Sequence, residues 1–220
     1  MNSTMRKLFV TILIALTIST AKTEAGTDED AIRACFREYQ AAIANKDGKA
    51  AASLVSKPTL SYFASILNNA LNADEAKVRR LDFYRKMMVL LVRQDLSDTY
   101  KASGYSTNAS HFFALIIDRG WVGQVGAGNL ELGKITMDVD VIASAPGILN
   151  GQATPAKFVF ERTAGGWKFS LLDVILRVNK LTAEKQKNAL VNEDDAILQS
   201  LEARTGRPIR KDIWKPIRAR

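Results

Sequence analysis

The residue types with the widest chemical repertoire, histidine and cysteine, each occur once among the 220 residues of this chain. A zinc site with two or more histidines therefore cannot form within one chain, and nothing in the sequence brings His111 and Cys35 together. His111 opens a predicted helix and fits either an exposed helix start or a general base in a pocket. Cys35 fits a small buried hydrophobic residue, with an intermolecular disulfide as the alternative. We predict no metal site and no cofactor, and assign no catalytic residue.

Asp138 and Asp140 have the spacing that places two carboxylates on one face of a strand. Paired carboxylates can perform acid–base catalysis when their environments differ. The opposite face carries Met137, Val139 and Val141, which are apolar and should turn toward the protein. We therefore expect the two aspartates to face water.

Three aromatic residues combine an apolar body with a polar tip, as side chains of an amphipathic pocket do: Tyr39, Tyr62 and Trp121. Together with His111 they are the candidates for lining a pocket. The same residues suit the rim of an ordinary core equally well, so both interpretations stay open.

The spacing of apolar residues predicts that the first half of the chain is helical. Ile32, Phe36 and Tyr39 fall on one face of a helix for which Thr27 is a plausible N-cap. The stretch 97–107 is polar and rich in turn-forming residues. The predicted helices are 27–45, 49–55, 59–71, 73–95 and 108–119.

The predicted helix 73–95 is the longest, and its apolar residues cover more than one stripe, so it should pack on two sides. Its basic residues fit either a binding patch or, more commonly, a solvated face that acidic neighbours balance. These basic residues are Arg79, Arg80, Arg85, Lys86 and Arg93.

A β-hairpin is predicted over 154–172, where side chains alternate between an aromatic and a mostly polar face. Gly165 and Gly166 supply the turn. Before it, 130–141 is predicted as one long strand with a bulge at Gly133, and 145–151 as a connection. The aromatic face carries Phe158, Phe160, Trp167 and Phe169.

After the hairpin, 173–181 has no clean period and remains unassigned. A short helix should follow from the cap at Thr182 to residue 190. Asn192 should cap another helix, which ends near residue 204 with Gly206 as its C-terminal cap.

The helices of 31–55 and the hairpin of 157–172 resemble the opening and the closing strands of the NTF2-like superfamily. The resemblance covers roughly 28–175. It implies an α+β cone, in which N-terminal helices pack on a curved antiparallel sheet and leave a pocket. The division it suggests is a signal peptide (1–25), this domain (26–175), a helical extension (176–203) and a basic tail (204–220). Isomerases, dehydratases, cyclases, transport adaptors and immunity proteins share the superfamily, and none of their catalytic patterns matches this chain.

The N-terminus has the order of a secretory signal peptide: Arg6 and Lys7, an apolar run over 8–18, then small residues. Cleavage after Ala21 or Ala25 fits, and an uncleaved anchor is the alternative. We expect an exported protein, periplasmic if the source is bacterial and otherwise secreted. The 21 basic and 21 acidic residues of 26–203 balance, so nucleic acid is not an expected partner.

The tail 204–220 holds seven of the 31 basic residues and one acidic residue, Asp212. Isoleucines and Trp214 interrupt the charges, so we expect the apolar residues to pin the tail to the domain, with Trp214 as anchor and the charges in water. The exposed charges would face an anionic partner, such as lipid head groups or an acidic protein surface; the alternative is a tail docked for stability alone. The candidate contact residues are Trp214, Arg210, Lys211 and Lys215.

The sequence favours an exported binding or interaction protein without catalysis, with a small apolar ligand or a protein as partner and homodimerisation possible. Two alternatives stay open. One is an isomerase, dehydratase or cyclase that uses the cone pocket, and the other is an immunity or inhibitor protein against an exported toxin.

Overall fold

The computed structural model describes residues 27–102, 107–122, 129–189 and 192–219. Within 129–189, the side chains are described as far as Glu184. The predicted signal peptide and the loop glycines after residue 122 lie outside these residues. The first helices are α1 (Asp28–Ala44), α2 (Gly48–Leu54), α3 (Lys57–Asn72), α4 (Glu75–Arg79), α5 (Phe83–Asp95), α6 (Ser97–Ala102) and α7 (Ala109–Asp118). The sheet follows, and then come α8 (Leu172–Ala189), α9 (Glu193–Thr205) and a short 3-10 helix, η2 (Ile217–Ala219).

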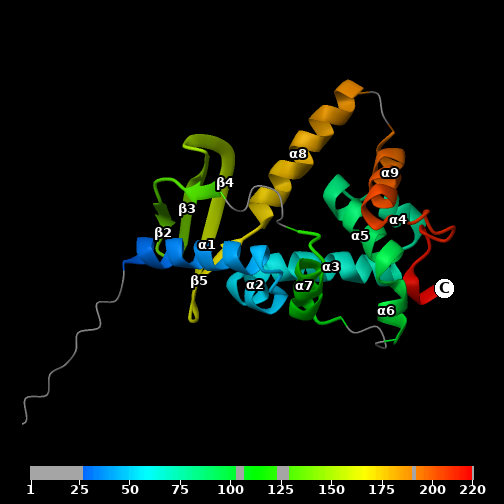
Figure 1. The fold of residues 1–220 in the computed structure, drawn as a ribbon, viewed down its shortest axis with the longest axis horizontal. Coiled ribbons are helices and arrows are strands. Elements are labelled where there is room, and N and C mark those ends of the chain that lie inside the picture. The colour runs from blue at the N-terminus through cyan, green and yellow to red at the C-terminus, as the bar shows by residue number, and fades with distance from the viewer. Residues whose placement is uncertain (1–26, 103–106, 123–128, 190–191, 220) are drawn as a thin grey trace, which may run out of the picture.

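The sheet is antiparallel and curled, with the order β1-β3-β4-β5. Its strands are β1 (Leu130–Leu132), β2 (Thr136–Val139), β3 (Ile142–Leu149), β4 (Gln152–Thr163) and β5 (Gly166–Ser170). Both β1 and β2 pair with β3, one after the other along the same edge. Figure 1 shows the sheet at one end of the molecule and α4, α5, α6, α9 and the C-terminus at the other. The chain is therefore an α+β protein, as the sequence predicted.

Helix α1 packs on the sheet through aromatic side chains. The ring of Phe36 lies 5.3 Å from that of Phe158 and 5.6 Å from that of Phe169, centroid to centroid. On β3 the residues in register with the β4 aromatics are Ala143 and Ala145, which are buried and small enough to leave room for the rings. Burial of this aromatic face stabilises the sheet, because it removes a large apolar area from water.

The predicted hairpin is confirmed as β4 and β5, which pair from Val159 with Ser170 to Thr163 with Gly166. Gly166 has a φ of 91°, a conformation that side chains with a Cβ rarely adopt. Trp167 is 6% exposed, as expected of a core residue. Its indole Nε1 donates to Asp28 Oδ1 at 3.1 Å, so the hairpin also holds the start of α1.

The predicted helix 73–95 is wrong in one respect, because the chain breaks between α4 and α5. Arg80 forms the C-terminal cap of α4, and the Asp82 side chain accepts a hydrogen bond from Arg85 N at 3.0 Å to cap α5. Aspartate competes well for exposed amides at a helix start, which favours a new helix here over a continuous one. The stretch 97–107, expected to be turn-rich, begins with helix α6.

The strand predictions need two corrections. Residues 130–141 form two strands separated at Gly133, and the register shift lies between Met137 and Val139. Residues 145–149, expected in a connection, belong to β3, and the turn comes at Asn150 and Gly151. Alanine, proline and glycine are weak strand formers, but here β3 is held between partner strands on both sides.

The aspartates Asp138 and Asp140 are exposed, as expected. The apolar residues that alternate with them are exposed too, which corrects the expected burial: Met137 (42%), Val139 (57%) and Val141 (51%). This part of the sheet edge therefore presents aliphatic side chains to solvent.

The unassigned stretch 173–181 is part of α8, which also includes Thr182, so no new helix starts there. Helix α8 connects the sheet to α9 and packs on β4 and α5. Asn192 caps α9, and Gly206 forms its C-terminal cap with a φ of 64°, both as predicted. No helix among the described residues is long and apolar enough to cross a membrane.

Candidate functional site: the C-terminal surface and the α2–α7 cleft

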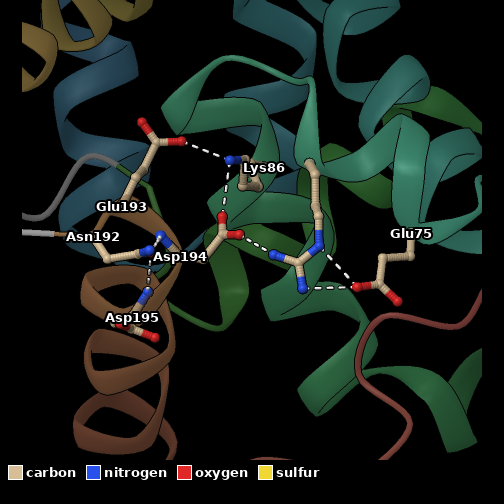
Figure 2. A network of polar contacts seen from close by, with 7 residues as sticks. Glu75, Lys86, Asn192, Glu193, Asp194 and Asp195 are labelled. Carbon is tan, nitrogen blue, oxygen red and sulfur yellow. Dashed lines mark hydrogen bonds and ion pairs between the residues drawn. The ribbon is translucent and has the colours of Figure 1, made fainter.

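The start of α9 is held by a buried lysine of α5 (Figure 2). Lys86 is 5% exposed, and its Nζ donates to Glu193 Oε1 at 2.7 Å and to Asp194 Oδ1 at 2.9 Å. Burial lowers the pKa of Lys86, but the hydrogen bonds from its ammonium to the two carboxylates offset this, and the net shift is upward. The ammonium is therefore the link between α5 and α9.

Arg79 extends this network to the C-terminal segment, residues 206–219. Its guanidinium bonds with Glu75 one turn away and with Asp194 of α9. It also lies over the ring of Trp214, 4.0 Å from the ring centroid. A cation over an indole face is attracted by the π-electrons, so α4, α9 and the C-terminal segment are joined at this point.

Arg93 fixes the C-terminal segment from beneath and is completely buried. Its guanidinium donates to Asn69 O at 3.0 Å and Ala70 O at 3.1 Å, near the end of α3. It also donates to Trp214 O at 2.7 Å. Asn69 O also accepts from Ala73 N at the end of α3, whereas the Ala70 carbonyl belongs to the last turn, whose carbonyls lack helical partners, so Arg93 satisfies it and ties α3 to the segment.

The burial of Lys86 and Arg93 corrects the expectation of a solvated basic face on this helix. A signal was present in the sequence, because both residues stand within or beside the apolar run that ends at Leu96. Arg80 is exposed, as that expectation requires.

The C-terminal segment packs on the domain through its isoleucines. Ile213 and Ile217 are buried, whereas Trp214 is half-buried. The expected anchoring is therefore present, and Ile213 and Ile217 are more deeply buried than Trp214, which packs against the core in part. The side-chain amide of Gln94 makes two hydrogen bonds with the segment backbone. Its Nε2 donates to Pro208 O at 3.0 Å, and its Oε1 accepts from Arg210 N at 3.1 Å.

The basic residues of the segment and of the end of α9 are exposed except Arg210, which is half-buried and lies 3.7 Å from Asp98. The expectation that the charges stay in water therefore needs correction for Arg210 alone. Several of the exposed side chains also contact the domain: Arg204 donates to Gly120 O, Arg207 pairs with Asp95, and Arg218 donates to Asn72 Oδ1 at 3.2 Å. Lys211 and Lys215 are exposed as well.

Two of the predicted pocket residues, Tyr39 and Tyr62, lie in the interior near Tyr84. Tyr39 is 5% exposed, with its ring 5.0 Å from that of Phe169, and the rings of Tyr62 and Tyr84 are 6.4 Å apart. Burial, and then the nearby Tyr84, raise the pKa of Tyr39, and burial is the main cause that raises the pKa of Tyr62 to about 12. The Tyr39 hydroxyl is buried without a hydrogen-bond partner among the described residues, whereas the Tyr62 ring lies under the Arg85 guanidinium, 4.6 Å from it.

The other two pocket candidates lie elsewhere. Trp121 is half-buried just after α7, where its amide donates to Ile116 O at 2.8 Å. His111 is exposed at the start of α7 and lines an open cleft between α2 and α7. The cleft has a volume of about 470 Å³ and is not lined by Tyr39, Tyr62 or Trp121. The four candidates therefore do not form one pocket.

The single cysteine, Cys35, is buried on α1, in agreement with the packing interpretation. Burial is the main cause that raises the pKa of its thiol to about 11. Among the described residues no group of three or more histidine, cysteine or acidic side chains is placed to hold a metal ion.

No protein-family model, no curated protein and no solved structure matches this chain.

Proposed function

We propose that this protein is an exported binding protein without catalysis, which attaches to anionic lipid head groups through its C-terminal segment. The observation that carries the proposal is the arrangement of Trp214. Its indole is half-buried under Arg79 and stands between two exposed lysines, Lys211 and Lys215, with Arg218 close behind in the chain.

The physical basis is the combination of charge and indole on a firm support. Basic residues near an anionic membrane contribute about 1 kcal/mol each, and tryptophan is the side chain that favours the boundary between head groups and acyl chains. Arg93 and the buried isoleucines hold the backbone of the segment in place. Membrane binding therefore does not carry the entropic cost of ordering this backbone. Neighbouring acidic side chains are already engaged by the fold, such as Asp95 with Arg119 and Arg207.

The scaffold of this binding protein is, in our proposal, an NTF2-like domain. What supports it is the long helix α1 across a curled antiparallel sheet that the β4–β5 hairpin closes. In this protein the space between α1 and the sheet holds the rings of Phe36, Phe158 and Phe169, which favours a binding role at the surface over one in the cone.

The test uses vesicles of phosphatidylcholine alone and vesicles that also contain phosphatidylglycerol. We expect the exported protein to sediment with the anionic vesicles only, with binding that weakens as salt rises, because charges are screened over about 8–10 Å at physiological ionic strength. The fluorescence of Trp214 should shift to the blue on binding.

The decisive variant replaces Lys211, Lys215 and Arg218 by glutamine and should abolish sedimentation. The control removes the same charge from exposed lysines elsewhere, Lys57, Lys134 and Lys180, and should bind like the parent. If both variants lost sedimentation equally, the net charge of the protein would explain binding, and the proposal would be overturned. Binding to an acidic protein with no binding to anionic vesicles would overturn the choice of lipid.

A further inference from the structure

The cleft between α2 and α7 lies outside the proposed membrane surface and has the build of a small-molecule site. Its volume of about 470 Å³ falls within the range of roughly 300–1,000 Å³ that is usual for such sites. Ala52, Ala114 and Leu115 give it an apolar lining from both helices. Polar side chains complete the lining, and this combination lets a site bind an apolar body and orient a polar group.

The two walls of the cleft are fixed against each other at one end. A Cβ at Gly48 would lie 2.1 Å from Ala114 O, so only glycine allows this close approach of α2 to α7. Gly48 N also donates to Asp118 Oδ1 at 2.7 Å. These contacts fix the separation of the two helices, so that the cleft exists before any ligand arrives.

The polar groups of the lining favour an anion. Lys49 and His111 stand on opposite walls, and neither side chain forms a hydrogen bond or ion pair with another described residue. Ser53 and Ser110 add hydroxyl groups, and that of Ser53 already donates to Ala50 O at 2.7 Å. The carboxylate in the lining, Asp118, already accepts through Oδ1 from the Gly48 amide, the first amide of α2. Lys49, His111 and the Ser110 hydroxyl are therefore the donors that an anion can meet in the cleft.

We propose that this cleft binds a small carboxylate with a short apolar body. The carboxylate meets Lys49 and His111, and the apolar part lies against Ala52, Ala114 and Leu115. An ion without an apolar part would leave that lining in contact with water, which is why the chemistry favours an organic acid over a bare inorganic anion.

The chain has one histidine, so every histidine imidazole signal in its NMR spectrum belongs to His111 and needs no further assignment. Benzoate is titrated into the protein while the His111 imidazole is followed by NMR, and benzamide serves as the neutral probe of the same shape. We expect a saturable shift with benzoate and none with benzamide at the same concentrations. Equal binding of the two, or no shift with either, would overturn the proposal.

Two variants place the site. Lys49→Gln should weaken benzoate binding about tenfold, because it removes a charge-assisted hydrogen bond, whereas Lys57→Gln, an exposed lysine outside the cleft, should leave it unchanged. Ser53→Tyr puts a ring on the exposed rim and should block binding without a change in the melting temperature. Undiminished binding by either cleft variant would mean that benzoate binds elsewhere and would contradict the proposal.

Discussion

The two ends of the molecule are held together by different forces. At the sheet end, α1 meets β4 and β5 through closely packed aromatic rings. At the helical end, cations inside the fold do the joining: Lys86 binds the start of α9, and Arg93 binds α3 and the C-terminal segment. Apolar contacts depend little on pH and salt, whereas a buried ammonium or guanidinium depends on the groups that satisfy it. The two ends should therefore fail under different conditions.

Truncation of an aromatic side chain at the sheet end should have the largest effect on the free energy of unfolding. Trp167→Ala removes a buried indole from the hairpin, and we expect a loss of about 3–5 kcal/mol in the free energy of unfolding. Trp214→Ala is the matched change at the helical end and should cost about 1 kcal/mol, because that ring is only half-buried. Urea denaturation of both variants measures the difference. Equal losses would contradict the contrast between the two ends.

Arg93→Met tests the helical end and should come next, with a loss of about 3 kcal/mol, because the carbonyls of Ala70 and Trp214 lose the donor that the guanidinium supplies. The C-terminal segment should then detach and become sensitive to trypsin at Arg210 and Lys211. Limited proteolysis followed by mass spectrometry detects this. A segment that stays protected would show that its isoleucines hold it without the arginine.

The Lys86 network predicts a specific loss of stability in alkali. The pKa of Lys86 is raised in the fold, so its stabilisation is complete below 10.5, the ordinary value, and is lost as the pH rises through the higher folded value. Lys86→Met should cost about 1–3 kcal/mol at neutral pH and should remove that part of the alkaline loss. Melting curves of parent and variant across this range give the comparison, and parallel curves would refute the role of the ammonium.

Tyr39→Phe gives the smallest expected effect and the one with the opposite sign. The hydroxyl is buried with no described partner, so its removal should raise stability by about 1 kcal/mol. Tyr100 is another buried tyrosine, and Tyr100→Phe serves as a reference for the effect of replacing a buried tyrosine by phenylalanine on the free energy of unfolding. If Tyr39→Phe instead lowers the melting temperature, a bound water or ligand satisfies this hydroxyl in the folded protein.

Local signals determined the elements that the sequence predicted correctly. Thr27 caps α1, Asn192 caps α9, and Gly206 ends α9, because each cap needs only its own side chain or φ angle and the next turn of helix. The hairpin turn at Gly166 is equally local. The alternation of aromatic residues on β4 and β5 also predicted which face is buried, since the period of a strand fixes the side of each residue.

The tertiary structure alone decided the remainder. Strand β3 contains Pro146 and Gly147, which oppose a strand, and it forms because β1, β2 and β4 supply its hydrogen bonds. Lys86 and Arg93 look like surface charges in the sequence, but the partners of Lys86 lie in α9, and those of Arg93 lie in α3 and in the C-terminal segment. The same holds for the cleft, where α2 and α7 supply opposite walls. A sequence pattern reports neighbours one or two turns away, whereas the burial of a charge and the shape of a cleft depend on which distant segments meet.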